Sequence, residues 1–243
     1  MFFLIQKRTT TFSTRDKTMN MIYTAIAGDY DKLKPHPPVK NCQFIAFVDD
    51  PKKHSNEGWE TRQLIPFHSD PVRNAKQYKI MAHEHLRRAT YSLWIDGNIS
   101  IKNGFDLDEL INKYLTDHDL ALFRHPKRNC LYREAATCRI HLLDNSSIIN
   151  EQIARYRSKK FPENYGLTEN RIILRRHTPL VAQLNTTWWK EICDGSRRDQ
   201  LSFMYSIWKT KITFTYLPGN ARHNPFFGLN RHLRARSRFN ISP

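Results

Sequence analysis

An acid, a glycine and an amide interrupt a strongly apolar stretch near the middle of the chain. Residues 92–95 read Ser-Leu-Trp-Ile, Asp96-Gly97-Asn98 follows, and an alternating apolar pattern resumes at residues 99–101. In open α/β sheets, ligands bind beyond the carboxyl ends of the strands, where such side chains project. A carboxylate and an amide offer hard oxygen ligands to Mn²⁺ or Mg²⁺. We therefore predict that Asp96 and Asn98 hold a cation that carries a phosphate.

The alternative is that residues 96–98 form only a tight turn, because Asp, Gly and Asn favour turns. The β-branched and apolar residues on both sides favour a strand that runs through instead. Asp49 ends another apolar stretch in the same way. Basic side chains follow on the next predicted helix at Arg73, Lys76 and Lys79, where they either clamp a diphosphate or form a solvated face.

Asp199 and Gln200 follow two arginines at the predicted start of a late helix. Asp199 has the position of a helix cap, a structural role that contributes about 1 kcal/mol. However, Arg197 and Arg198 at a helix N-terminus oppose the helix dipole. A bound anion or a paired carboxylate would relieve that conflict, and the spacing alone favours neither interpretation.

Aromatic and basic residues elsewhere suit a ligand that is rich in hydroxyl groups. His125 and Arg128 follow a predicted strand, and Trp188 and Trp189 offer rings on which sugars stack. Core packing is the alternative for the tryptophans, because adjacent residues on a helix face different directions. His223 follows the last predicted strand, where a neutral imidazole would complete a metal site or lie in solvent.

Buried strands alternate with helices along the chain, which predicts an α/β fold with a mainly parallel sheet flanked by helices. The Asp70-Pro71 pair is a strong signal for the start of a helix. We expect one domain over residues 21–220, between a flexible arm (1–20) and a basic tail (221–243). Strands are predicted at 21–27, 43–48, 60–65, 92–95, 120–123, 172–174 and 213–217, and helices at 105–114, 147–157, 179–192 and 199–209 as well as after Asp70.

The composition limits the possible partners. The 243 residues carry a formal charge of +16, which attracts phosphate-bearing partners of any kind. No apolar run reaches the roughly 20 residues that cross a bilayer. Four scattered cysteines predict reduced thiols in a cytoplasmic protein, and the tail gives it peripheral contact with anionic membranes. The tail includes Arg222, Arg231, Arg234, Arg236 and Arg238.

A nucleic-acid-binding protein without catalytic activity is the leading alternative, because of the same charge. The sequence has neither an aromatic-basic motif of the RNA-recognition type nor the spacing of a zinc finger, which argues against nucleic acid as the partner.

Several segments, in order, resemble a family of glycosyltransferase-like domains found in plant cell-wall and mucilage proteins and in bacterial polysaccharide loci. More distantly, the chain is similar to the glycogenin-like retaining glycosyltransferases. The matching segments are Tyr23-Thr24-Ala25-Ile26, Gly28-Asp29-Tyr30-Asp31, Arg73-Asn74-Ala75-Lys76, Lys79-Ile80, Trp94-Ile95-Asp96-Gly97-Asn98, His125 with Arg128, Tyr132-Arg133-Glu134-Ala135, Trp188-Trp189-Lys190-Glu191 and Arg198-Asp199-Gln200-Leu201-Ser202.

The resemblance implies a GT-A fold, in which a Rossmann-like nucleotide-binding half merges with an acceptor-binding half. It implies transfer of a hexosyl or pentosyl group from a nucleoside-diphosphate sugar, with UDP favoured, to a glycan in polysaccharide biosynthesis. Asn98 departs from the acid expected at its position in the metal motif. The implied roles are donor binding by Tyr23, Thr24, Asp49, Arg73, Lys76, Trp94 and Asp96, metal binding by Asp96, Asn98 and His223, chemistry at the anomeric carbon by Asp199 and Gln200, and acceptor binding by His125, Arg128, Trp188 and Trp189.

Overall fold

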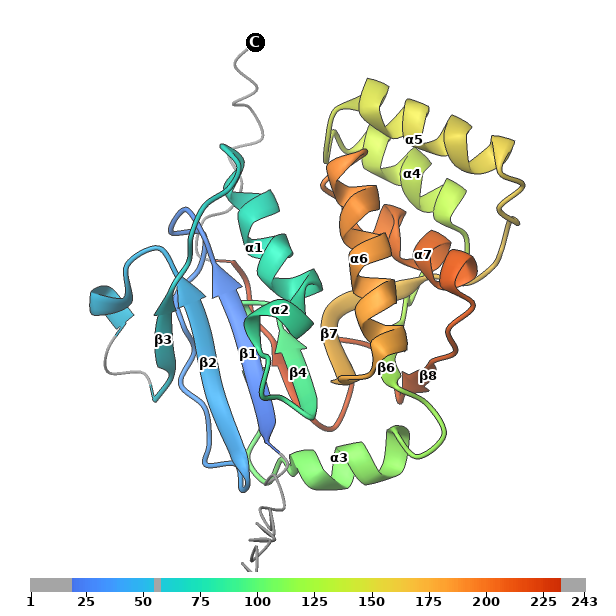
Figure 1. Ribbon diagram of the computed structural model, residues 1–243. Coiled ribbons are helices and arrows are strands. Elements are labelled where there is room, and N and C mark those ends of the chain that lie inside the picture. The colour runs from blue at the N-terminus through green and yellow to red at the C-terminus, as the bar shows by residue number, and fades with distance from the viewer. Residues whose placement is uncertain (1–18, 55–57, 233–243) are drawn as a thin grey trace, which may run out of the picture.

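The computed structural model describes residues 19–54 and 58–232 (Figure 1). Most of the predicted N-terminal arm lies outside these residues, as do Arg234, Arg236 and Arg238 of the predicted tail. Within the described ranges, no helix combines the length and the apolar character needed to cross a membrane.

A seven-stranded sheet forms the centre of the molecule, in the order β3-β2-β1-β4-β7-β6-β8. Strand β7 is antiparallel to both of its neighbours, and the other pairs are parallel. The structure thus confirms the predicted mixed, mainly parallel α/β sheet. The strands are β1 (Asn20–Ile26), β2 (Cys42–Val48), β3 (Glu60–Gln63), β4 (Tyr91–Ile95), β6 (Leu120–Arg124), β7 (Thr168–Arg176) and β8 (Thr215–Leu217).

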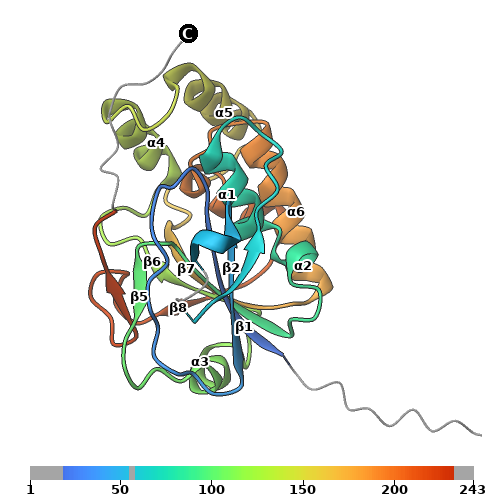
Figure 2. The ribbon, with the colours of Figure 1, turned by 90° about the vertical axis from the view of Figure 1, so that its left-hand side faces the viewer.

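Helices cover both faces of the sheet (Figures 1 and 2). Successive strand residues alternate between two cores, so that Tyr23 faces one core and Ile22 the other. The second core packs against α3 (Leu107–Tyr114). The first core includes residues of α1 (Pro71–Ile80), α2 (Ala82–His85), α4 (Leu131–Ile140), α5 (Ser146–Ser158), α6 (Pro179–Cys193) and α7 (Phe203–Thr210).

Helix α1 begins where the Asp70-Pro71 signal predicts. The Asp70 carboxylate accepts a hydrogen bond from the Val72 N–H at 2.9 Å, and Pro71 takes the first helical position. The helix ends at Ile80, and α2 follows after Met81. The carbonyl of Lys79, in the last turn, accepts a hydrogen bond from the Tyr23 hydroxyl at 2.9 Å. This backbone oxygen therefore has its partner in the sheet.

The strand predicted to run through residues 96–98 does not do so. Strand β4 ends at Ile95, Gly97 and Asn98 form a turn, and the separate strand β5 (Ile99–Ile101) pairs with β9 (Phe227–Leu229). The Ile99 N–H closes the turn by donating to the Asp96 carbonyl at 2.8 Å, and the turn packs closely, because a Cβ on Gly97 would lie 3.2 Å from the Cβ of Asp31. The segment predicted as a tail from residue 221 is consequently part of the fold as far as His232.

Candidate functional site

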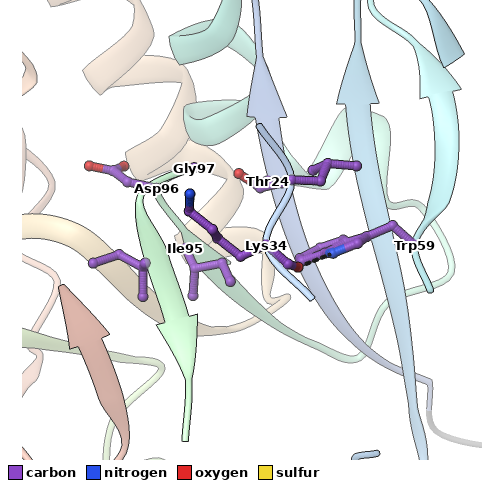
Figure 3. A pocket seen from close by; sticks show the side chains of 8 residues that line it. Thr24, Lys34, Trp59, Ile95, Asp96 and Gly97 are labelled. Carbon is purple, nitrogen blue, oxygen red and sulfur yellow. Dashed lines mark hydrogen bonds between the residues drawn. The ribbon is translucent and has the colours of Figure 1, made fainter. Parts of the chain in front are cut away.

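Three parallel strands, β1, β2 and β4, end at the same edge of the sheet and place polar groups there. Asp49 follows β2 and accepts a hydrogen bond from the Gly28 N–H, after β1, at 2.5 Å. Asp96 follows β4 and lines a small hollow with Thr24, Lys34 and other residues (Figure 3). The hollow holds about 10 Å³, room for one water molecule. Predicted site residues thus meet at this edge, but a nucleotide needs more space than the hollow offers.

Two lysines of α1 contact Asp199, and one of them also contacts Asp96 at the end of β4. The Lys79 ammonium lies 3.1 Å from Asp96 Oδ1 and 2.8 Å from Asp199 Oδ2. The Lys76 ammonium lies 2.6 Å from Asp199 Oδ1. Only 4% of the Lys79 side chain is exposed. We refer to Lys76, Lys79, Asp96 and Asp199 as the lysine–aspartate cluster.

Asp199 does not cap a helix, so that interpretation of the sequence was wrong. The residue begins the 3-10 turn η2 (Asp199–Leu201), and its carboxylate bonds the two lysines. Burial alone would raise the pKa of Asp199, but Lys76 and Lys79 outweigh burial and hold this pKa well below its usual value. Asp199 is therefore a carboxylate at any pH where the protein would work.

Lys76 has an unusual acidity for a lysine. Its pKa falls to about 8, chiefly because burial disfavours the charged form. The carboxylate of Asp199 opposes this shift, while Lys79 and Arg198 add to it as neighbouring cations. The Lys76 side chain thus changes between ammonium and neutral amine near pH 8.

Two tryptophans support the cluster, one through the carboxylate of Asp96 and the other through the backbone of Asp199. The Trp94 indole N–H donates to Asp96 Oδ1 at 2.8 Å, and the Lys79 ammonium lies 5.5 Å from the Trp94 ring centre. The Trp188 indole N–H donates to the backbone oxygen of Asp199 at 3.2 Å. Trp188 is fully buried, so the structure does not support its predicted role as a ring on which an acceptor sugar stacks.

Two predicted donor-binding residues also point elsewhere. Tyr23 is fully buried beneath the site and contacts Lys79 and Trp94, so no ligand reaches it in this structure. The Arg73 guanidinium donates to the backbone oxygens of Ile192 and Gly195 at the end of α6. It satisfies helix-end carbonyls there rather than facing the strand ends.

The predicted acceptor residues His125 and Arg128 meet on a carboxylate that the sequence analysis did not assign to the site. Glu134 is buried and accepts a hydrogen bond from Arg128 Nε at 2.5 Å, and His125 Nε2 lies 3.8 Å from it. Burial lowers the pKa of His125. Gln200 directly follows Asp199 of the cluster, and its side-chain amide donates to the Thr168 carbonyl at 3.3 Å.

Trp189, the other predicted acceptor residue, is half-buried. Its ring lies edge-on against Phe67, with 5.2 Å between the ring centres. Phe67 is half exposed, so this pair leaves an aromatic surface open to a ligand.

The residues predicted to bind a metal do not form a ligand set. The Asn98 amide donates to the Asn230 carbonyl at 2.9 Å, and its oxygen is closed off from solvent. Asp96 is bonded by Lys79 and Trp94, and His223 lies in an exposed turn between β8 and β9. In the part of the chain that the structure describes, no three His, Cys, Asp or Glu side chains converge on a common point.

A different histidine reaches the strand ends. His232 Nδ1 lies 2.7 Å from Asp31 Oδ2, and its imidazole packs on Tyr30 with 4.7 Å between the ring centres. Asp31 in turn lies against Gly97, next to Asp96. No role was predicted for His232, because it lies among arginines in the segment that was predicted to be a basic tail.

A mainly parallel sheet with polar and charged side chains at the carboxyl ends of its strands defines an α/β protein of the class in which ligands bind beyond those ends. Over residues 9–218 the chain matches the family described as "TOD1/MUCI70, glycosyltransferase-like domain", and it belongs to that family. This confirms the resemblance seen in the sequence.

One relative is the "Probable hexosyltransferase MUCI70" of Arabidopsis thaliana, which is 32% identical over 149 residues. The alignment covers 57% of this chain and 25% of the relative, so the chain corresponds to about a quarter of that protein's length.

Proposed function

We propose that this protein is a glycosyltransferase that moves a sugar, most simply a hexosyl group, from a nucleoside-diphosphate sugar to a glycan. The observation that carries the proposal is the lysine–aspartate cluster at the carboxyl edge of the sheet. Membership of a glycosyltransferase-like family and the relative named as a hexosyltransferase support the same class of reaction. UDP is the favoured nucleotide, and polysaccharide biosynthesis is the proposed context.

The lysines account for the main electrostatic demand of this reaction. When the bond between the anomeric carbon and the diphosphate breaks, its electron pair stays with the diphosphate, which gains negative charge. Ammonium groups already fixed at that position stabilise this charge, usually the largest single contribution to catalysis. In the proposal, Lys76 and Lys79 bind the diphosphate, while Asp199 and Gln200 face the anomeric carbon. The acceptor oxygen forms the new bond to the anomeric carbon, and its proton passes to the departing diphosphate.

The resemblance implied Mn²⁺ or Mg²⁺, but Asp96, Asn98 and His223 do not form a ligand set. The cation therefore has no assigned role in the proposed reaction. Retention of configuration at the anomeric carbon stays a prediction from the resemblance. The cytoplasmic location and the contact with anionic membranes also stay predictions, and the arginines at 234, 236 and 238 lie outside the described residues.

A thermal-unfolding screen tests the proposal. We expect UDP to stabilise the protein by ~2.7 kcal/mol at a hundredfold excess over its Kd, both in EDTA and with Mn²⁺. GDP and CMP should stabilise it less, and uridine, which lacks phosphates, should have no effect. If no nucleoside diphosphate changes the unfolding temperature in either buffer, the proposed function is wrong.

The acidity of Lys76 predicts how binding depends on pH. Below its pKa of about 8 the side chain is charged and binds the diphosphate, and above this pKa it is neutral. We therefore expect the affinity for UDP to fall about tenfold as the pH rises from 7 to 9.5, since a hydrogen bond to a charged group contributes about 1.5–3 kcal/mol. Isothermal titration calorimetry measures this profile.

The matched variant for the pH profile is Lys76→Arg, which keeps its charge across the whole range. Its affinity for UDP should be nearly constant between pH 7 and 9.5. An equally steep fall in the variant would assign the titration to another group.

A further inference from the structure

A buried arginine without an acidic partner lies in the sheet beneath the lysine–aspartate cluster. Arg175, on β7, is 1% exposed, and no carboxylate among the described residues pairs with it. Its Nη1 donates to the Tyr23 hydroxyl at 2.6 Å, while its Nε and Nη2 have no partner within the described ranges. Burial of a cation without an acidic partner destabilises the fold, so an arginine at this position needs a structural or functional explanation.

The hydrogen bond to Tyr23 fixes the direction of the next one. A guanidinium can only donate, so the Tyr23 hydroxyl must accept from Arg175 and turn its own hydrogen elsewhere. That hydrogen goes to the backbone oxygen of Lys79, 2.9 Å away. This oxygen belongs to the last turn of α1, which otherwise has no helical partner for it. The buried charge thus holds the end of α1 against β1.

The same tyrosine supports the other side of the cluster. Its ring lies edge-on against Trp94, with 5.1 Å between the ring centres, and Trp94 donates to Asp96. The backbone of Lys79 and the carboxylate of Asp96 are therefore both positioned from Tyr23. Tyr23 thus contacts the supports of both partners in the ion pair between the Lys79 ammonium and Asp96, which lie 3.1 Å apart.

We propose that Tyr23 and Arg175 are positioning residues that hold the Lys79 ammonium at the strand ends. The inference rests on the proposed function, in which Lys79 binds the diphosphate of the donor. Neither residue touches the ligand; they act through the backbone of Lys79 and the ring of Trp94. This role replaces the donor contact that the sequence predicted for Tyr23.

Tyr23→Phe removes only the hydroxyl group, and the chain offers a close control. Tyr78 is also buried, lies next to Lys79 on α1, and accepts a hydrogen bond from the Ile65 N–H at 2.8 Å. That bond leads to the loop before α1, away from the cluster. Tyr23→Phe should lose more stability than Tyr78→Phe in urea unfolding, because it also leaves the buried Arg175 guanidinium without its hydrogen-bond partner. Only Tyr23→Phe should weaken UDP binding, by five- to tenfold, with a larger loss in kcat than in donor KM.

A readout without any ligand tests the positioning directly. In the native protein the buried Lys79 ammonium should react slowly with acetic anhydride, measured by peptide mass spectrometry against the exposed Lys113 in the same sample. We expect Tyr23→Phe to raise the relative labelling of Lys79 severalfold, and Tyr78→Phe to leave it unchanged.

The outcomes separate the two proposals. Unchanged labelling of Lys79 in Tyr23→Phe, or an equal rise in both variants, overturns the positioning role whether or not UDP binds. If the native protein binds none of UDP, GDP and CMP in EDTA or with Mn²⁺, the proposed function fails, and the labelling alone then decides what Tyr23 does. A UDP affinity in Tyr23→Phe that matches Tyr78→Phe also contradicts the positioning role.

Discussion

Lys79→Met is expected to lower the turnover of a nucleotide-sugar donor by about 10²–10³-fold, the loss that follows removal of one fixed electrostatic group at a developing charge. Lys79 contacts both carboxylates of the lysine–aspartate cluster. Methionine has a similar volume and flexibility, so the variant removes the charge and retains most of the packing. Release of the nucleoside diphosphate, followed with a coupled assay, measures the effect.

The control for this variant is Lys113→Met, which removes an exposed lysine from α3, away from the cluster. Its turnover should stay within twofold of the native value. Turnover of Lys79→Met at a similar level would show that Lys79 forms only a structural ion pair.

Asp199→Asn is expected to destabilise the fold by about 3–5 kcal/mol at pH 7, the loss typical of a buried ion pair deprived of one partner. Both carboxylate oxygens are bonded, one by Lys76 and the other by Lys79, and the side chain is 8% exposed. An amide offers a single oxygen, so the two ammonium groups would share it without a negative charge between them. Urea unfolding measures the difference.

The pH dependence of this loss has a definite sign. The pKa of Asp199 is lowered on folding, so its contribution is complete above the unfolded pKa of about 3.9 and disappears as the pH falls below that value. The difference in stability between the native protein and Asp199→Asn should therefore shrink steadily as the pH falls from about 4 to 2, and it disappears only below the lowered pKa of the folded state.

Asp194→Asn is the matched control for Asp199. Asp194 forms an exposed pair with Lys190 at 2.9 Å, and exposed pairs contribute little because solvent screens them. A loss in Asp199→Asn no larger than in Asp194→Asn would mean that burial does not amplify the interactions within the cluster.

Local signals in the sequence predicted most of the strands and several helices correctly. Asp70 and Pro71 marked the start of α1 because both act within a few residues of themselves. The prediction of a strand that runs through residues 96–98 was wrong, because Asp96, Gly97 and Asn98 form the turn that these residue types favour, and β4 ends at Ile95. Strand β7 was predicted too short, because the buried Arg175 interrupts its apolar pattern and resembled a residue in solvent.

Long-range contacts explain the remaining differences in the site. Whether Lys79 lies in solvent or in an ion pair depends on Asp96 and Asp199, which reach it from other parts of the chain. The sequence spacing shows neither contact. Trp188 was predicted to face a sugar because of its ring, and Tyr23 to bind the donor because of the family resemblance, whereas the structure buries both to support Asp199 and Lys79. The type of a residue suggests its chemistry, but only the fold decides which groups it faces.

The order of strands has a consequence for how the chain is made. Strand β4 has β1 on one side, but its other neighbour, β7, is not synthesised until residues 168–176. At about 5–20 residues per second, the nascent sheet waits roughly 4–16 seconds with that edge open. Open edges of hydrophobic strands pair readily with other chains. Until β7 is made, this edge of the nascent sheet is therefore a place where the chain can pair with a neighbouring one.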